Sequence, residues 1–235
     1  MLSTPDGAWA ERLLLGLRPA VEEHGLFLGV ATFDSPDAVP AGPGEERLLQ
    51  DMLPARRSEF TAGRCAARRA LARAGIPAGE ILRAGRRPRM PAGSVGSITH
   101  CAGAAVALAA PRWRSPSVGI DLELRPLPPR AARLVLSPDE QSWLNRTSRT
   151  EAGEAEDEGR LLAAFSAKEA AFKAFSTLLA PQEAPTMLLG IAIRPVPGGF
   201  RAWPRRLPGR VLDVAVRPVG PGVLSWTAAP PGAQY

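Results

Sequence analysis

Apolar and polar residues alternate along the chain with two periodicities, and these periodicities predict its helices and strands. A period near 3.6 residues predicts a helix, and strict alternation predicts a strand with one buried face. In the first half they predict helices over residues 8–18, Glu45–Leu53 and Ala55–Ala74, and strands over Leu26–Phe33, Ser94–His100 and Ala104–Ala109. In the second half they predict a helix over Leu161–Ala180 and strands over Val118–Leu124, Leu188–Arg194, Gly199–Trp203, Val211–Val216 and Val223–Ala228. Each half therefore combines helices with short strands.

Three segments between these elements carry signals of their own. Pro111–Ser117 is punctuated by proline and serine and is predicted to be a hinge between the halves. Ser137, Pro138 and Glu140 fit the N-cap, N1 and N3 positions of a short helix, which is a capping box. Thr147–Arg160 is acidic and poor in apolar residues, so a mobile loop is predicted there.

The helix over Leu161–Ala180 contains only three charged residues, Lys168, Glu169 and Lys173. One sector of it is apolar, and the opposite side is almost entirely alanine. A surface helix would place charges on that side, so this helix is predicted to pack on both sides. Its charges then need partners, because an uncompensated buried charge costs several kcal/mol.

The charges on this helix allow two interpretations. Glu169 and Lys173 are spaced i,i+4, and such a pair stabilises a helix by roughly 0.3–0.5 kcal/mol. The lysine count favours a chemical role, because Lys168 and Lys173 are the only two lysines beside 27 arginines. A compact ammonium, for which a planar guanidinium does not substitute, is therefore predicted to be required on this helix.

The composition of the 235-residue chain excludes several classes of protein. With 45% hydrophobic residues, it is large enough for one sizeable domain or two small ones. No run of about 18 apolar residues is present that would span a membrane. The N-terminal stretch carries Asp6 and Glu11 instead of a basic region, so no signal peptide is predicted and a cytoplasmic location is expected. Cys65 and Cys101 make neither a disulfide framework nor a metal site.

Positive charge concentrates between Arg56 and Arg89, where ten arginines stand beside only two acidic residues. Within this stretch Arg56, Phe60, Arg64 and Arg68 recur every four residues along one stripe of a helix. Such a stripe is either a solvated helix face or a site for phosphate, nucleic acid or an acidic partner. Composition alone does not choose between them.

The segment G-I-D-L-E places two carboxylates on one face of a strand. Alternation puts Asp121 and Glu123 roughly 7 Å apart, with Ile120 and Leu122 on the other face. Two such carboxylates repel each other at a buried strand unless a positive charge lies between them. Oxygen ligands of this kind suit Mg²⁺, whereas a partly exposed strand would explain the same pattern without a metal.

The segment G-S-I-T-H-C places Thr99 and His100 where a strand meets a tight turn. A single histidine in such a position is usually structural. A hydroxyl beside an imidazole at a strand end also suits a phosphate, and both interpretations stand at this point.

Taken together and in order, four motifs resemble those of one family, the 4′-phosphopantetheinyl transferases. They are R-R-x-E-F-x-x-G-R, G-S-I-T-H-C, G-I-D-L-E and F-S-A-K-E-A-x-F-K-A, and the resemblance covers about residues 45–180. The match is to the type that activates peptide and polyketide synthetases. It implies an α+β fold of two similar halves related by a pseudo-twofold axis, each a small antiparallel sheet packed against helices. The halves would span residues 1–116, with the nucleotide and phosphate contacts, and 117–235, with the metal-binding strand and the Lys–Glu helix.

The resemblance also implies a role for each motif residue. Asp121, Glu123 and Glu169 would hold Mg²⁺ (or Mn²⁺), and Glu169 would also take the proton from the carrier-protein serine. Lys173 would neutralise charge on the pyrophosphate of coenzyme A. Further contacts to coenzyme A would come from Arg56, Arg64, Arg83, Thr99, His100 and Lys168. The chain departs from the family pattern at Met90, where an aromatic residue is expected, and in the acidic segment Glu151–Glu158.

The implied function is transfer of phosphopantetheine from coenzyme A to a serine of acyl or peptidyl carrier protein domains, with release of 3′,5′-ADP. This step serves polyketide, non-ribosomal peptide, siderophore or fatty-acid synthesis. Carrier proteins are usually acidic around that serine, so a pI near 10.5 favours the encounter. A monomer without membrane or nucleic-acid partners is expected.

Two other functions explain part of the sequence. A basic nucleic-acid-binding module accounts for the arginines but not for the D-x-E strand or the confined lysines. Single-strand binders also interleave aromatic residues with the basic ones, and Phe60 is the only aromatic residue between Arg56 and Arg89. Another Mg²⁺-dependent enzyme acting on a nucleotide accounts for the acids but not for the order of the motifs.

Overall fold

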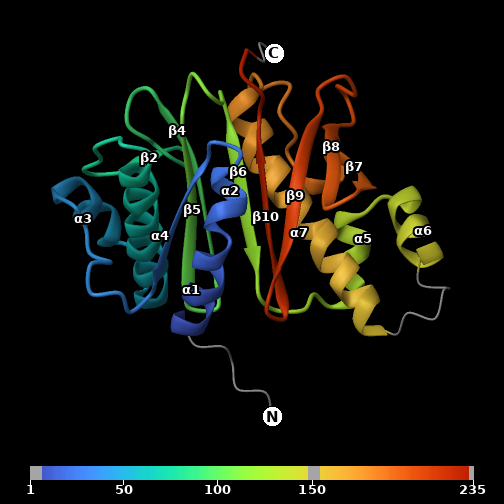
Figure 1. The fold of residues 1–235 in the computed structure, drawn as a ribbon, viewed down its shortest axis with the longest axis horizontal. Coiled ribbons are helices and arrows are strands. Elements are labelled where there is room, and N and C mark those ends of the chain that lie inside the picture. Colours follow the sequence, from blue (N-terminus) through green and yellow to red (C-terminus); the bar gives the residue numbers. More distant parts are fainter. Residues whose placement is uncertain (1–6, 148–153, 233–235) are drawn as a thin grey trace. The chain divides into compact units, whose positions relative to one another are not determined.

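The structure is a computed structural model that describes residues 7–147 and 154–232. Its contacts divide the chain into two compact units, coloured along the sequence in Figure 1. The N-terminal unit runs to Val118 and includes Pro230–Gly232, and the C-terminal unit comprises Gly119–Ala229. The division falls one residue after the segment Pro111–Ser117. In the described ranges, no helix is both long enough and apolar enough to cross a membrane.

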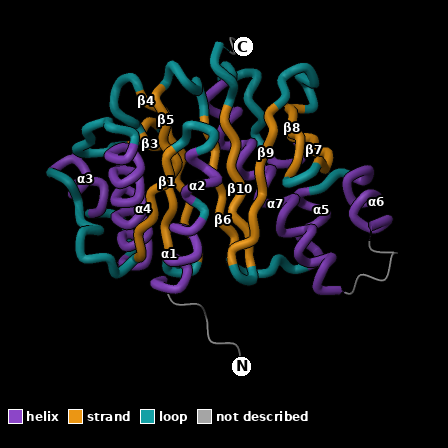
Figure 2. The backbone as a smooth tube through the Cα atoms, in the orientation of Figure 1, coloured by secondary structure: helices purple, strands orange, loops and turns teal. Residues whose placement is uncertain are grey.

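The N-terminal unit packs helices against a three-stranded antiparallel sheet of order β1-β5-β4. Its strands are β1 (Phe27–Thr32), β4 (Ser94–Cys101) and β5 (Ala104–Pro111), with a separate hairpin of β2 (Arg83–Ala84) and β3 (Arg87–Pro88). Its helices are α1 (Gly7–Gly16), α2 (Arg18–Glu22), α3 (Pro43–Leu49) and α4 (Pro54–Arg73). The long helix α4 lies along β1, β5 and β4, as Figure 2 shows.

The C-terminal unit packs helices against a five-stranded sheet of order β6-β10-β9-β8-β7. Its strands are β6 (Val118–Glu123), β7 (Ile191–Val196), β8 (Gly199–Pro204), β9 (Leu212–Val219) and β10 (Gly222–Ala228). Its helices are α5 (Ala132–Val135), α6 (Pro138–Thr147) and α7 (Glu154–Leu178), with short 3₁₀ turns at Pro129–Ala131 and Leu188–Gly190. The two units confirm the predicted α+β class, because each combines helices with antiparallel strand pairs.

In each unit the long helix touches a strand backbone at a glycine. A Cβ atom placed on Gly29 of β1 would lie 2.0 Å from the Ala66 carbonyl oxygen of α4. A Cβ atom placed on Gly119 of β6 would lie 1.9 Å from the Ala170 carbonyl oxygen of α7. Only glycine permits so close an approach of the strand backbone to the helix backbone. The small alanine side chains of both helices also let each helix lie close to its strand. Between residues 161 and 180 only Thr177 is exposed, so the predicted two-sided packing of this helix is confirmed.

One predicted loop contains regular structure. Helix α7 begins at Glu154, so the prediction of a loop to Arg160 was wrong for its last seven residues, while residues 148–153 lie outside the described ranges. Glutamate and alanine have high intrinsic helix propensities, which explains why the helix begins this early. The basic stretch after Ile81 forms the β2–β3 hairpin, whose turn contains Gly85 at φ +64°. The predicted tight turn between β4 and β5 is confirmed, with Ala102 and Gly103 both at positive φ.

Candidate active site

The carboxylates of the D-x-E segment lie on the face of β6 that meets α7. Gly119 contacts the α7 backbone, and strand alternation places Asp121 and Glu123 on the same face. Asp121 is 4% exposed and Glu123 is partly buried, whereas Ile120 and Leu122 on the opposite face are fully buried. The expectation of two carboxylates on one face of a buried strand agrees with this arrangement.

Lys173 of α7 meets this pair of carboxylates directly. Its Nζ donates to Asp121 Oδ1 at 2.8 Å and to the Ile120 carbonyl oxygen at 2.9 Å. The lysine side chain is 27% exposed and the aspartate side chain 5%, so Asp121 is buried while Lys173 is partly accessible to solvent. An ammonium in this position holds β6 to α7 and retains one donor for another anion.

Glu123 sits in an excess of negative charge. Burial and the nearby charges of Asp121 and Glu169 together raise its pKa to about 7, against the opposing effect of Lys173. The influence of Glu169 places this α7 residue within electrostatic range of the β6 carboxylates. The structure therefore gathers Asp121, Glu123, Glu169 and Lys173 around one contact between a strand and a helix.

The donor set at this contact fits a hard divalent cation. All its acidic groups offer oxygen ligands, and the raised pKa of Glu123 shows that added positive charge would stabilise its ionised form. In the conformation described for residues 7–147 and 154–232, no three His, Cys, Asp or Glu side chains converge closely enough to hold a metal ion. The Lys173 ammonium instead contacts Asp121, so metal binding would require this contact to open or to be shared.

Lys168, which the resemblance assigns to coenzyme A, is buried inside the C-terminal unit. Its side chain is 0% exposed, and Nζ donates to Glu140 Oε2 at 2.7 Å and to the Val135 carbonyl oxygen at 2.8 Å. Burial lowers the pKa of this ammonium, and the Glu140 carboxylate opposes that shift. These contacts give no support to Lys168 as a coenzyme A contact, and that assignment stays a prediction.

Arg56 and His100 come together in the N-terminal unit. Arg56 Nη1 donates to His100 Nε2 and to Glu59 Oε2, each at 2.7 Å. Because an arginine only donates, Nε2 accepts in this contact, which assigns the proton of a neutral His100 ring to Nδ1. The arginine side chain is 48% exposed, so an incoming phosphate reaches the same guanidinium.

Arg64 is almost completely buried, and its guanidinium contacts the protein itself. It is 7% exposed, its guanidinium lies 4.3 Å from the Phe60 ring centroid, and it donates to the backbone oxygens of Ile81 and Leu82. Burial, with the positive charges of Arg83 and other arginines, lowers its pKa to about 10. The contacts support a role in holding the segment that leads into β2, and a direct nucleotide contact remains a prediction.

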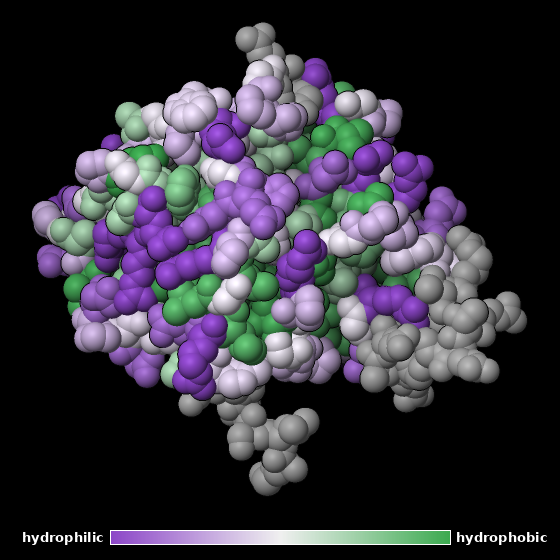
Figure 3. Space-filling view, in the orientation of Figure 1, coloured by the Kyte–Doolittle hydropathy of each residue, from purple (hydrophilic) through white to green (hydrophobic). Residues whose placement is uncertain are grey.

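The predicted basic stripe of α4 (Arg56, Phe60, Arg64 and Arg68) is neither a fully solvated helix face nor a continuous exposed row of positive charges. Phe60 and Arg64 are buried, and the arginines that follow are engaged in ion pairs, namely Arg68 with Glu45, Arg69 with Asp37 and Glu11, and Arg73 with Glu22. In Figure 3, hydrophilic side chains gather over the part of the view where Figure 1 draws α3, α4 and β1. The ion pairs neutralise Arg68, Arg69 and Arg73, whereas the Arg56 side chain is 48% exposed.

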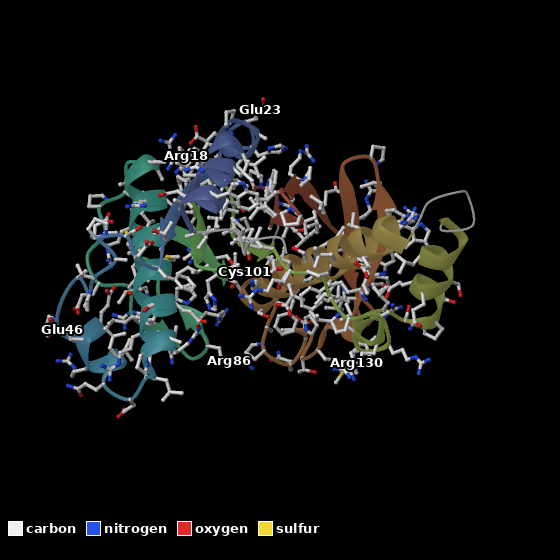
Figure 4. All side chains as sticks on the ribbon, turned by 90° about the horizontal axis from the view of Figure 1, so that it is seen from below. Arg18, Glu23, Glu46, Arg86, Cys101 and Arg130 are labelled. Carbon is white, nitrogen blue, oxygen red and sulfur yellow. The ribbon has the colours of Figure 1, made fainter. Side chains whose placement is uncertain are left out.

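A surface cavity of about 470 Å³ lies where α3 ends and α4 begins. Three arginines line it, Arg47, Arg56 and Arg83, together with Asp51 and apolar residues of the α3–α4 connection. Two of these arginines were assigned to coenzyme A from the sequence. Arg86, labelled in Figure 4, lies at the turn of the neighbouring hairpin and is exposed. The cavity combines cationic and apolar walls, as a nucleotide phosphate and base require.

Thr99 and His100 point to opposite faces of β4. Ile98 meets α4, since a Cβ atom on Gly63 would lie 3.0 Å from its side chain, and His100 contacts Arg56 of the same helix. Alternation then directs Thr99 to the other face, where it is 6% exposed. The two adjacent side chains therefore lie on opposite faces of the sheet, and their joint binding of a phosphate stays a prediction.

Two residues that the sequence reasoning did not assign to the site have clear places in the structure. Arg47 lines the cavity, and no motif marks it in the sequence. Glu140 was predicted only as a helix cap, which it is, since its Oε2 accepts the Ser137 N–H at 2.8 Å. The same carboxylate also neutralises Lys168. The signal for that role was a lysine on a helix predicted to be buried, because such a charge requires an acidic partner.

Two family models match the chain in succession. The 4′-phosphopantetheinyl transferase N-terminal domain matches residues 44–110, and the 4′-phosphopantetheinyl transferase superfamily matches residues 117–188. The two matched ranges contain all the residues that were assigned to the site.

Three bacterial relatives carry the same family name. The chain is 42% identical over 165 residues to the 4′-phosphopantetheinyl transferase Svp of Streptomyces mobaraensis, a match covering 68% of this chain and 62% of Svp. It is 40% identical over 147 residues to Npt of Nocardia iowensis, covering 62% of this chain and 63% of Npt. It is 35% identical over 168 residues to PptT of Mycobacterium tuberculosis, covering 71% of each chain. The matches thus span less than two thirds of Svp and Npt.

Proposed function

Because the chain belongs to the 4′-phosphopantetheinyl transferase superfamily, we propose that it transfers phosphopantetheine from coenzyme A to a serine of an acyl or peptidyl carrier protein. The observation that carries this proposal is the cluster of Asp121, Glu123, Glu169 and Lys173 at the contact of β6 with α7. It combines acids suited to a divalent cation, a carboxylate base and an ammonium, which are the groups that transfer from a pyrophosphate requires.

In the proposed reaction, the serine hydroxyl oxygen attacks the phosphorus that bears the pantetheine arm. The bond from this phosphorus to the bridging oxygen of the pyrophosphate breaks, and 3′,5′-ADP leaves with the electron pair. Glu169 accepts the hydroxyl proton as the general base. Its place on α7 is rigid, because the helix is packed along the sheet of the C-terminal unit.

Lys173 stabilises the negative charge that builds up on the pyrophosphate as the bond breaks. Its ammonium is held by Asp121 and by the Ile120 carbonyl oxygen before any substrate binds. A donor fixed in advance costs no reorganisation during the reaction, and such donors supply large parts of catalysis.

Asp121, Glu123 and Glu169 are the residues that would hold Mg²⁺. When bound, the ion would supply charge stabilisation to the pyrophosphate oxygens. The buried position of Asp121 and the raised pKa of Glu123 support this assignment, because both carboxylates gain from a nearby positive charge.

The N-terminal unit carries the residues proposed for the nucleotide end of coenzyme A. Arg56 and Arg83 line the cavity, and His100 contacts Arg56, so a 3′-phosphate bound there would meet at least two cationic groups. Arg64 supports Arg83 indirectly by holding the backbone of Ile81 and Leu82.

The proposal is tested by incubating the purified chain with coenzyme A, Mg²⁺ and an apo carrier protein, and measuring 3′,5′-ADP by chromatography. We expect release that requires both the carrier protein and its serine. A chain that binds coenzyme A but releases no 3′,5′-ADP with a panel of acyl and peptidyl carrier proteins would contradict the proposal.

A further inference from the structure

The residue next to the proposed base is anchored inside the protein. Lys168 precedes Glu169 on α7, and its side chain is among the largest that are fully buried. Its ammonium contacts Glu140 Oε2 at 2.7 Å and the Val135 carbonyl oxygen at 2.8 Å. These contacts tie α7 to the end of α5 and to the first turn of α6.

Glu140 is the centre of this anchor, because both oxygens of its carboxylate accept two bonds. Oε2 accepts from Lys168 and from the Ser137 N–H at 2.8 Å. Oε1 accepts from the Ile193 N–H at 2.9 Å and lies 3.0 Å from an Arg205 guanidinium nitrogen. A carboxylate offers about four acceptor sites, so this one is fully used. The anchor therefore joins α7 to α6, to β7 and to the turn after β8.

Such a buried ion pair adds little to the free energy of unfolding, but it fixes the positions of the side chains that form it. Well-packed apolar residues in place of both charges are often as stable as the pair or more so. Apolar contacts tolerate a small rotation of a helix, whereas two short charge-assisted bonds fix the direction of the side chain that makes them. The pair at Lys168 thus fixes the rotation of α7 about its own axis.

We propose that Glu140 and Lys168 are positioning residues, which hold the Glu169 carboxylate in the orientation needed for proton transfer. The inference rests on the proposed function of Glu169. Neighbouring side chains on a helix are about 100° apart, so fixing residue 168 also fixes the direction of residue 169. At the outer radius of a helix, about 5–6 Å, a rotation of roughly 10° moves a carboxylate by about 1 Å. A displacement of that size costs on the order of a hundredfold in rate.

The N-terminal unit contains a matched arrangement that has no proposed base beside it. Glu45, third in a helix that also begins with proline, is 0% exposed and accepts from the Ile81 N–H at 2.7 Å. It also accepts from Arg68 of α4, with both carboxylate oxygens 3.1 Å from the guanidinium. Each unit thus ties its long helix to a neighbouring segment through a buried glutamate. The Glu45–Arg68 pair therefore serves as an internal control for the structural part of the effect.

The test compares two neutralised pairs, Glu140→Gln with Lys168→Met and Glu45→Gln with Arg68→Met. For each double variant we measure kcat, the KM for coenzyme A, the Kd for coenzyme A by calorimetry, and Tm. We expect the Glu140/Lys168 variant to lose about ten- to a hundredfold in kcat, with Kd and KM for coenzyme A within about threefold of wild type. The Glu45/Arg68 variant should keep kcat within about threefold at a comparable loss of Tm.

Each other outcome overturns the inference. A rise of tenfold or more in the Kd for coenzyme A, without the loss of kcat, would show that Lys168 binds a phosphate. Wild-type kcat in the folded Glu140/Lys168 variant would show that the pair serves only the fold. Should the Met-containing pair not fold, Glu140→Gln with Lys168→Gln retains a neutral hydrogen bond, and the same kinetic pattern is required of it. A wild-type chain that transfers nothing refutes the proposed function itself, which separates the two failures.

Discussion

Lys173→Arg isolates the geometry of the charge at the proposed site, because it preserves the charge and changes its shape. The ammonium of Lys173 rests 2.8 Å from Asp121 Oδ1 and 2.9 Å from the Ile120 carbonyl oxygen. An arginine side chain is longer than lysine and ends in a planar group. Because α7 and β6 are in close contact at Gly119, the helix cannot shift to make room for the longer side chain. Its fork must therefore project past the point where the ammonium ends.

The expected loss can be estimated for activity and for stability separately. Losing one preorganised donor to developing charge typically costs about 3 kcal/mol, which is roughly a hundredfold in kcat. The ion pair itself is partly exposed, so its loss lowers stability by about 1 kcal/mol at most. For a chain of this length that corresponds to roughly 2–4 °C in Tm.

The assay is steady-state transfer to a carrier protein, combined with a melting curve for the same preparation. The account predicts that Lys173→Arg loses about a hundredfold in kcat, with at most a similar rise in the KM for coenzyme A and a small change in Tm. Wild-type kinetics would refute the reasoning, because charge alone would then suffice. A fall in Tm of well over 10 °C would also refute it, because the lysine would then be mainly structural.

Three further predictions concern other residues assigned to the proposed function. Glu169→Gln keeps the shape of the side chain but removes the base, so kcat should fall by at least about a hundredfold while Tm stays near wild type; near-normal turnover would exclude the assigned role. Arg56→Ala should weaken binding of coenzyme A much more than binding of 3′-dephospho-coenzyme A in calorimetry, and equal losses would place this arginine outside the 3′-phosphate site. The pKa of Glu123 is raised from 4.5 to about 7, so between these values the folded chain holds a proton that the unfolded chain releases. Without divalent metal, stability should therefore be greatest at the acidic end of this window and fall as the pH rises through about 7. Glu123→Gln should flatten this part of the Tm–pH curve, and identical curves for the two proteins would contradict the shift.

Local patterns predicted the parts of the site that depend on one element at a time. Alternation in G-I-D-L-E placed Asp121 and Glu123 on one face, and the structure turns that face toward α7. The alanines of α7 predicted a buried helix, and the capping-box pattern predicted the start of α6 at Pro138. In each case the physical cause is a repeat or a cap within a few residues of chain.

Contacts between distant segments explain what the sequence did not reveal. The partner of Lys168 lies 28 residues earlier in the chain, on another helix, so periodicity could show that a partner was needed but not which acid it was. Arg64 looked like an outward-facing cation because its spacing from Arg56 is helical, but the Ile81–Leu82 backbone covers it. Thr99 and His100 differ from these cases, because strand alternation alone already implied opposite faces.

The most direct test of the central claim is the intact mass of an apo carrier protein after incubation with this chain, coenzyme A and Mg²⁺. The account predicts that the carrier gains the mass of one phosphopantetheinyl group, that the gain disappears when the carrier serine is replaced by alanine, and that Glu169→Gln in the chain prevents it. An unchanged carrier mass in the presence of folded, coenzyme A-binding chain would contradict the account.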